Sequence, residues 1–371
     1  MGAIRALAAA AVVLTAAALT ACSSSGAAQP GSSAPSPAAA TAPAPGAALL
    51  KETGSTLLYP LFNIWAAAYH SQFPRITITT ASTGSGTGLS AAADRQADIG
   101  ASDAYLSSAN VAESPDLENI PLAISAQQVS YNLPELKGVS LRLNGTILAQ
   151  MYQGTITRWN DPAIAKLNPG VTLPPTKVVP LHRSDSSGDT FLFTTYLSNQ
   201  DDAWASSVSY GTAVAWPQAS GALAAKGNTG MVSACAATTG CVAYIGISYE
   251  SQTAAAGLGQ AALLDEAGSY EPPTAAAIGA DAAGFASITP ASGTLSLIDG
   301  TSAGGYPLVN YEYAIVSTSQ PTPTRATDLQ ALLHWILTAG QESTYLSQVN
   351  FQPLPPSVVA IAQALIQKIT R

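Results

Sequence analysis

The chain has 371 residues, of which 47% are apolar and 10% are charged, and its formal net charge at pH 7 is −8. This length and apolar content are enough to bury a large core, and the length favours two lobes over one. The acidic balance, without any basic stripe in the sequence, argues against nucleic acid or another polyanion as a partner.

The first 21 residues have the composition of a secretion signal. Arg5 is followed by an Ala-rich apolar run that is too short for a spanning helix. The run ends in Leu19-Thr20-Ala21-Cys22, which resembles the bacterial lipobox, where a peptidase cuts before the cysteine and the cysteine carries lipid. We therefore predict a signal peptide over residues 1–21 and an exported monomer anchored by lipid at Cys22 to the outer face of the cell membrane. The alternative is a leader in which Cys22 is accidental.

A low-complexity segment follows the cysteine. Residues 23–47 consist of Ser, Gly, Ala, Pro, Gln and Thr and hold no large apolar side chain. Such a segment cannot collapse onto a core, so we predict a disordered tether over residues 22–47 and a folded part from about Ala48 on.

From Ala48 on, strand and helix signals alternate, which predicts the α/β class. Apolar residues at helical spacing indicate a helix within residues 52–73 that begins at Gly54-Ser55-Thr56, and its expected buried positions are Leu58, Phe62, Trp65 and Tyr69. The other expected elements are strands at 76–83, 97–102 and 177–183 and helices at 89–97 and 190–198.

Two further cysteines, Cys235 and Cys241, lie close together in the chain. In an exported protein this pair is most simply a disulfide. A redox pair is the alternative, but the spacing is not C-x-x-C and no basic residue between them would lower a thiol pKa. A metal site is disfavoured because the three histidines, His70, His182 and His334, share no ligand spacing.

The stretch RSDSSGDT, residues 183–190, lies where a predicted strand gives way to a predicted helix. The first N–H groups of a helix lack partners and the helix dipole is positive there, so the turn can hold an anion. Arg183 adds a planar fork for two oxygens, and Ser187 and Gly188 add a hydroxyl and a close backbone approach. A helix cap beside a surface Arg-Asp pair explains the same residues equally well.

Two other helix starts repeat this pattern, Gly54-Ser55-Thr56 and the TGSGTG segment around Ser85. Together with DIGASDAYLS, GTITRWNDPAIAKLNPG and RSDSSGDTF, in this order and spacing, the chain from about Glu52 to about Ile369 resembles the phosphate-binding proteins of ABC-type phosphate uptake systems. The resemblance implies a two-lobed type II solute-binding fold with the ligand in the cleft between the lobes. It implies one lobe from residues 48–129 plus 305–371 and another from residues 130–304.

The resemblance also implies the ligand contacts. Thr56 would donate its hydroxyl and Leu57, where the family often has Phe, its N–H; Ser85 would donate both groups. Arg183, held by Asp185, would bind two oxygens. The remaining N–H donors would be Ser187, Gly188 and Asp189. Many relatives have Thr where Asp189 stands, so this residue adds a carboxylate beside the ligand.

Asp103 would accept a hydrogen bond from the ligand, and it bears on selectivity. An acidic group in an anion site costs free energy unless it receives a proton donor. Phosphate at neutral pH carries at least one O–H, whereas sulfate carries none, so an acceptor favours phosphate. The alternative role for Asp103 is a turn or cap residue after the strand.

Three function classes follow. The leading hypothesis is a binding protein without cofactor that delivers phosphate to the permease subunits of an ABC importer, with sulfate or molybdate as the alternative ligand. A surface phosphatase-like hydrolase built on Ser187, Asp185 and His182 is disfavoured, because these residues lie too close in sequence for a relay and no G-x-S-x-G elbow accompanies them. A surface protein for adhesion or sensing is the third class.

Overall fold

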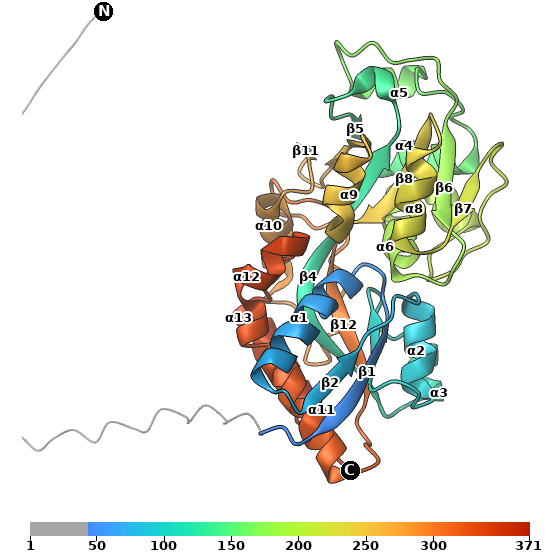
Figure 1. Cartoon of the computed structure of the whole chain (residues 1–371). Coiled ribbons are helices and arrows are strands. Elements are labelled where there is room, and N and C mark those ends of the chain that lie inside the picture. Colours follow the sequence, from blue (N-terminus) through green and yellow to red (C-terminus); the bar gives the residue numbers. More distant parts are fainter. Residues whose placement is uncertain (1–43) are drawn as a thin grey trace, which may run out of the picture. The chain divides into compact units, whose positions relative to one another are not determined.

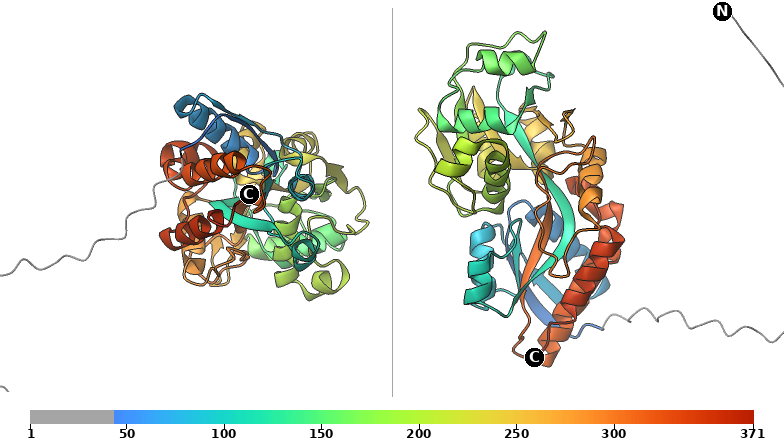
Figure 2. Two further views of the ribbon diagram at one scale, coloured as in Figure 1. Left: turned by 90° about the horizontal axis from the view of Figure 1, so that it is seen from below. Right: turned by 180° about the vertical axis from the view of Figure 1, so that it is seen from behind.

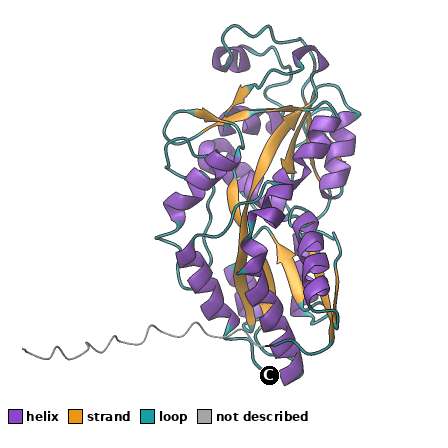
Figure 3. Ribbon diagram, turned by 60° about the vertical axis from the view of Figure 1, so that its left-hand side comes forward, coloured by secondary structure: helices purple, strands orange, loops and turns teal. Residues whose placement is uncertain are grey.

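The structure is a computed structural model that describes residues 44–371 (Figure 1). The predicted signal peptide, Cys22 and most of the predicted tether lie outside the described residues. Strands and helices alternate over most of the described chain, which confirms the predicted α/β class (Figure 3). In residues 44–371, no helix combines the length and the apolar character needed to span a bilayer.

One large mixed sheet runs through the described residues. Its strands are β1 (Ala48–Gly54), β2 (Ile76–Thr79), β3 (Ile99–Ser102), β4 (Leu117–Tyr131), β6 (Val179–Arg183), β7 (Leu223–Ala225), β8 (Cys241–Gly246), β9 (Gly259–Gln260) and β12 (Val309–Ser317). Their order is β2-β1-β3-β12-β4-β8-β6-β7, and β9 also pairs with β4. A separate small sheet contains β5 (Arg142–Leu143), β10 (Ala262–Leu264) and β11 (Tyr270–Glu271).

Strand β4 connects the two halves of the large sheet. Its residues 117–126 pair antiparallel with β12, which lies beside it in Figure 2, and its residues 127–131 pair antiparallel with β8. The outer strands of each half are parallel, as β1 pairs with β2 and β3, and β6 pairs with β7 and β8. The chain therefore passes between the halves within one strand. The predicted lobe boundaries at 129/130 and 304/305 stay a prediction.

Helices cover the sheets. They are α1 (Tyr59–Gln72), α2 (Ser85–Ala93), α3 (Ser108–Glu113), α4 (Gly145–Gln153), α5 (Pro162–Leu167), α6 (Gly188–Gln200), α7 (Asp202–Ser207), α8 (Gly227–Ala236), α9 (Glu250–Ala255), α10 (Ala275–Phe285), α11 (Pro323–Ile336), α12 (Ser343–Leu346) and α13 (Pro356–Ile366).

The predicted helix and strand positions need two corrections at helix ends. The first helix begins at Tyr59 and not at Gly54, because the Ser55 hydroxyl accepts the N–H groups of Leu57 and Leu58 and holds a separate turn before it. The helix predicted at 89–97 spans Ser85–Ala93, since the positive φ of Arg95, 56°, is incompatible with a right-handed helix.

The core confirms the expected burial in the first helix. Leu58, Phe62, Trp65 and Tyr69 are fully buried, and the Trp65 indole N–H donates to the Gly340 carbonyl at 2.9 Å. A buried indole needs such a partner, because an unpaired donor in the core costs free energy.

A disulfide joins Cys235, near the end of α8, to Cys241, at the start of β8. The predicted disulfide is therefore confirmed. Closing so short a loop contributes about 2 kcal/mol to the stability of the fold.

Candidate functional site

The three Ser- and Gly-rich helix starts meet at Asp103, which directly follows β3. The hydroxyl of Ser55, in the turn before α1, donates to Asp103 Oδ1, and the hydroxyl of Ser85, the first residue of α2, donates to Asp103 Oδ2 at 3.3 Å. Gly188 opens α6 against the same carboxylate, since a Cβ added to it would lie 2.5 Å from Asp103 Oδ2. Asp103 is 2% exposed, so its position is set by these contacts and not by solvent.

Arg183 is the cation of this cluster and is 3% exposed. It ends β6, and its guanidinium binds Asp185 through both Nε, at 2.7 Å, and Nη2. Its Nη1 donates to Asp189 Oδ2 at 2.6 Å and to the Thr56 hydroxyl at 3.2 Å. The predicted pairing of Asp185 with Arg183 is thus present in the geometry, while Asp189 adds a second buried carboxylate on the same guanidinium.

Several N–H groups that we expected to face a ligand have partners within the protein. The Ser187 N–H donates to the Thr212 carbonyl at 2.8 Å, and the Asp189 N–H donates to the Ser187 hydroxyl at 3.1 Å. The Leu57 N–H donates to the Ser55 hydroxyl at 3.1 Å. An anion that binds here must therefore replace some of these internal acceptors.

Asn228 also belongs to the cluster, and it is not among the contacts predicted from the sequence. Its amide nitrogen donates to the Thr56 hydroxyl and to Asp189 Oδ2, both at 2.8 Å, and its amide oxygen accepts the Gly246 N–H at 2.8 Å. It lies in the first turn of α8, just after β7. The segment KGNTG was a usable signal, because it is another polar, Gly-containing turn between a strand and a helix.

Burial and the charges of the cluster together shift the pKa values of its acids in opposite directions. Burial alone would raise the pKa of Asp185, but the hydrogen bonds and charge of Arg183 outweigh burial and lower it. Burial raises the pKa of Asp189, and Arg183 only partly opposes it. Burial and the neighbouring Asp189 raise the pKa of Asp103 as well. Two carboxylates, Asp185 and Asp189, thus share one guanidinium, that of Arg183.

Two small pockets flank the ion pair. One of about 260 Å³ is lined by Thr56, Asp185 and Asn228 among others, and one of about 280 Å³ is lined by Arg183 and Asp185. Between them, the side chains of Thr56, Arg183 and Asp189 are in direct contact.

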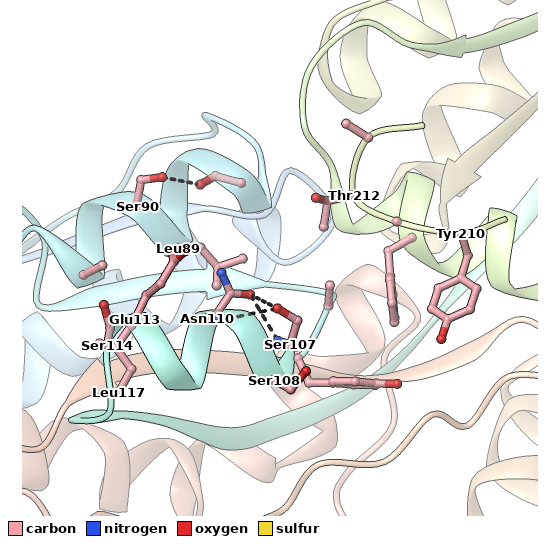
Figure 4. A pocket seen from close by; sticks show the side chains of 17 residues that line it. Leu89, Ser90, Ser107, Ser108, Asn110, Glu113, Ser114, Leu117, Tyr210 and Thr212 are labelled. Carbon is pink, nitrogen blue, oxygen red and sulfur yellow. Dashed lines mark hydrogen bonds between the residues drawn. The ribbon is translucent and has the colours of Figure 1, made fainter. Parts of the chain in front are cut away.

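A larger pocket of about 610 Å³ lies beside the cluster (Figure 4). It is bounded by α2 and α3 on one side and by residues 210–213 on the other, with Tyr105, Phe191 and Tyr210 in its wall. The ring centroid of Phe191 lies 5.3 Å from the ring centroid of Tyr105 and 5.8 Å from that of Tyr210. The residues that line it include none of the predicted ligand contacts, so the pocket and the predicted site are separate.

The residues of the hydrolase hypothesis do not form a relay. The His182 Nδ1 donates to the Arg183 carbonyl at 3.0 Å, and its ring stacks on Trp216 with centroids 4.7 Å apart. The Ser187 hydroxyl instead accepts the Asp189 N–H, as a helix cap does. Over residues 44–371, no group of three or more His, Cys, Asp or Glu side chains is placed to hold a metal ion.

Comparison of the sequence with known families and proteins gives a consistent result. A profile of the PBP superfamily domain matches residues 37–339. The phosphate-binding protein PstS of Methanocaldococcus jannaschii is 32% identical over 340 residues, which cover 86% of each chain. The phosphate-binding protein PstS3 of Mycobacterium bovis is 30% identical over 366 residues, which cover 95% of this chain and 94% of the relative.

Comparison with solved structures shows the fold. A high-affinity periplasmic phosphate-binding protein, PfluDING, solved with bound phosphate, has a TM-score of 0.66 at 20% identity, covering 85% of this chain and 93% of its own. The phosphate-binding protein of Stenotrophomonas maltophilia has a TM-score of 0.62 at 19% identity, covering 86% and 94%. The fold is therefore the two-lobed, type II fold of periplasmic binding proteins, as predicted.

Proposed function

Because the chain belongs to the PBP superfamily and, within it, to the family of the phosphate-binding proteins PstS, we propose that it binds inorganic phosphate outside the cell membrane and delivers it to an ABC permease. The observation that carries the proposal is that hydrogen-bond donors around Arg183 and a hydrogen-bond acceptor, Asp103, are buried close together. Arg183, Thr56 and Asn228 offer donors to an anion, and Asp103 offers an acceptor to its hydroxyl. A protonated oxyanion needs both kinds of contact.

In this proposal the ligand takes over contacts that the protein makes with itself. Phosphate oxygens replace Asp189 on the Arg183 Nη1 group and accept from Thr56 and Ser85. The start of α6 supplies Gly188 and its neighbours, where the helix dipole favours an anion. Asp185 keeps the other edge of the guanidinium, so that its fork stays oriented.

Calorimetric titration of the purified protein with phosphate, sulfate and molybdate at pH 7 tests this function. We expect one phosphate per chain and binding of both other anions that is at least about tenfold weaker, because each leaves Asp103 facing an unprotonated oxygen. Tighter binding of sulfate or molybdate would make another oxyanion the ligand, and no binding of any of the three would contradict the proposal.

The protein acts in this proposal as a receptor without catalytic activity. The Ser187 hydroxyl caps α6 and His182 stacks on Trp216, so neither is arranged for nucleophilic attack on a phosphate ester. Delivery then requires contact with the membrane permease subunits, which a monomer held near the membrane can reach.

Replacing Asp189 by asparagine is expected to strengthen phosphate binding by about 1 kcal/mol, or roughly fivefold. The asparagine keeps the size and the N–H of Asp189 but removes the charge that competes with the ligand for Arg183 Nη1. Calorimetry of the wild type and the variant at pH 7 measures the effect. Weaker binding by the variant would mean that Asp189 accepts a hydrogen bond from the ligand and does not compete with it.

Anchoring at Cys22 is the remaining part of the proposal, and it rests on the Leu19-Thr20-Ala21-Cys22 sequence. Growth of the producing bacterium with a radioactive fatty acid is expected to label the wild type and not Cys22→Ala. Bacterial lipoproteins carry two or three acyl chains, which hold a protein firmly where a single chain does not. Equal labelling of the two proteins would exclude Cys22 as the attachment point.

A further inference from the structure

Glu312 is a second buried carboxyl group near Asp103, and it is not one of the proposed ligand contacts. Glu312 lies in the middle of β12, at the centre of the large sheet, and is fully buried. Its Oε1 accepts from the Ser125 hydroxyl at 2.5 Å and from the Asn310 amide at 3.1 Å. Its Oε2 is buried and finds no donor among the described residues.

The pairing of β12 with β3 brings Glu312 close to Asp103. β12 is antiparallel to β3 with Tyr313 opposite Ser102 and Ala314 opposite Ala101. Glu312 precedes Tyr313, and Asp103 follows Ser102 in a bend, so the two residues lie at the same end of this pairing. Their carboxyl groups are hydrogen-bond partners, and this contact acts on the pKa values of both.

Two buried carboxyl groups in hydrogen-bond contact cannot both be ionised, and a hydrogen bond between them requires one shared proton. Burial and the charge of Asp189 raise the pKa of Asp103 to about 7, while its hydrogen bonds with Glu312 and Ser55 and the charge of Arg183 oppose the rise and favour its ionised form. Glu312 has neutral donors on one oxygen alone. Burial, together with the charge of Asp103, raises the pKa of Glu312 well above its usual range. Glu312 therefore holds the proton.

We propose that Glu312 is a positioning residue for phosphate recognition, whose protonated Oε2 donates to Asp103 and keeps Asp103 an ionised acceptor for the phosphate hydroxyl. This inference rests on the proposed function. An ionised carboxylate has about four acceptor positions, which is enough for Ser55, Glu312 and the ligand together once the Ser85 hydroxyl donates to phosphate.

This arrangement makes phosphate affinity depend on pH. When Glu312 loses its proton, the pair carries two negative charges and Asp103 loses a donor, so phosphate affinity falls as pH rises through the pKa of Glu312. The groups that face the pair are few. Asp103 faces Glu312 from the bend after β3, Asp189 and Arg183 act on Asp103 from α6 and β6, and the phenol of Tyr313 follows in β12.

The variant Glu312→Gln distinguishes proton donation by Glu312 from a purely structural role of this side chain. The glutamine oxygen can accept from Ser125 and Asn310, and its NH₂ can donate to Asp103 without a dissociable proton. Glu312→Leu removes the donor. Glu52→Gln is the matched control, because Glu52 is also a buried strand carboxyl and is 2% exposed. Burial raises the pKa of Glu52 to about 8, the backbone of Ala81 partly opposes this, and neither Asp103 nor Glu312 contributes.

The experiment measures phosphate affinity by calorimetry for the full protein and the three variants from about pH 6 to about pH 9. The ionisation of phosphate itself is common to all four and cancels in the ratios. We expect the affinity of the wild type and of Glu52→Gln to fall relative to Glu312→Gln at high pH, by up to about tenfold per pH unit. Glu312→Leu should bind at least about tenfold more weakly than Glu312→Gln at neutral pH.

A spectroscopic readout that needs no ligand accompanies the titration. In difference spectra against the wild type, Glu312→Gln should lose one infrared component of a protonated carboxyl group. Glu52→Gln should keep that component and lose a separate one, because burial raises the pKa of Glu52 to about 8. If the wild type binds phosphate and Glu312→Gln keeps the pH profile of the wild type, the inference is wrong and the proposed function stands. If the wild type binds no phosphate at any pH, the proposed function is wrong and Glu312 has no ligand to position.

Discussion

Replacing Arg183 by alanine is expected to weaken phosphate binding by about 2 to 5 kcal/mol, the cost of removing one partner from a buried charged contact. The guanidinium is buried, and its Nη1 group and the Thr56 hydroxyl beside it are the donors that a phosphate oxygen would use. Calorimetry at pH 7 measures the loss. The matched control is Arg142→Ala, because Arg142 is exposed in β5 and lies over the ring of Tyr270, 5.4 Å from its centroid.

The structure adds a second effect of the Arg183 substitution. Without the guanidinium, Asp185 and Asp189 lose their counterion, and an uncompensated buried charge destabilises a fold by several kcal/mol. We therefore expect a lower melting temperature for Arg183→Ala, which the sequence analysis did not require. Arg183→Ala combined with Asp189→Asn removes one of the two carboxylate charges left without a counterion. The double variant should therefore be more stable than Arg183→Ala but should bind phosphate no better. Equal phosphate affinity of Arg183→Ala and Arg142→Ala would mean that the site lies elsewhere.

Replacing Asp103 by asparagine is expected to change selectivity more than affinity. The wild-type carboxylate already accepts from Ser55 and Ser85, so it is an acceptor for the ligand and repels an unprotonated anion. The asparagine can turn its NH₂ towards the ligand and donate to sulfate, while its oxygen still accepts from phosphate. The free energy of an unsatisfied buried contact is about 1 to 3 kcal/mol, so the phosphate-to-sulfate affinity ratio should fall roughly tenfold to a hundredfold.

Competition titrations of the wild type and Asp103→Asn with both anions, at pH 7 and fixed ionic strength, measure that ratio. Phosphate affinity itself should change little, because the lost charge assistance and the relieved repulsion oppose each other. An unchanged ratio would show that Asp103 does not detect the proton of the ligand. Selectivity would then have to come from the donors around Arg183.

Local sequence was sufficient to predict those features of the fold that depend on consecutive residues. The apolar spacing of Phe62, Trp65 and Tyr69 predicts the buried face of α1, and the change from VVPLHR to SDSSGD predicts the turn between β6 and α6. The Ser- and Gly-rich turns identify helix starts in the same way, because unpaired N–H groups favour those residues locally. Errors occurred at helix ends, where one side chain decides the boundary, as the hydroxyl of Ser55 does before α1.

Tertiary structure alone decided how these turns combine. Asp103 and Glu312 are 209 positions apart and are brought together by the antiparallel register of β3 and β12, which no local pattern encodes. Asn228 reaches Thr56 from 172 residues away because α8 begins beside the turn before α1. The sequence by itself determined the α/β class, the polar turns that precede the helices and the family, since these depend on neighbouring residues. The partners of each buried charge depend on strand pairing between distant segments, so they became visible only in the folded chain.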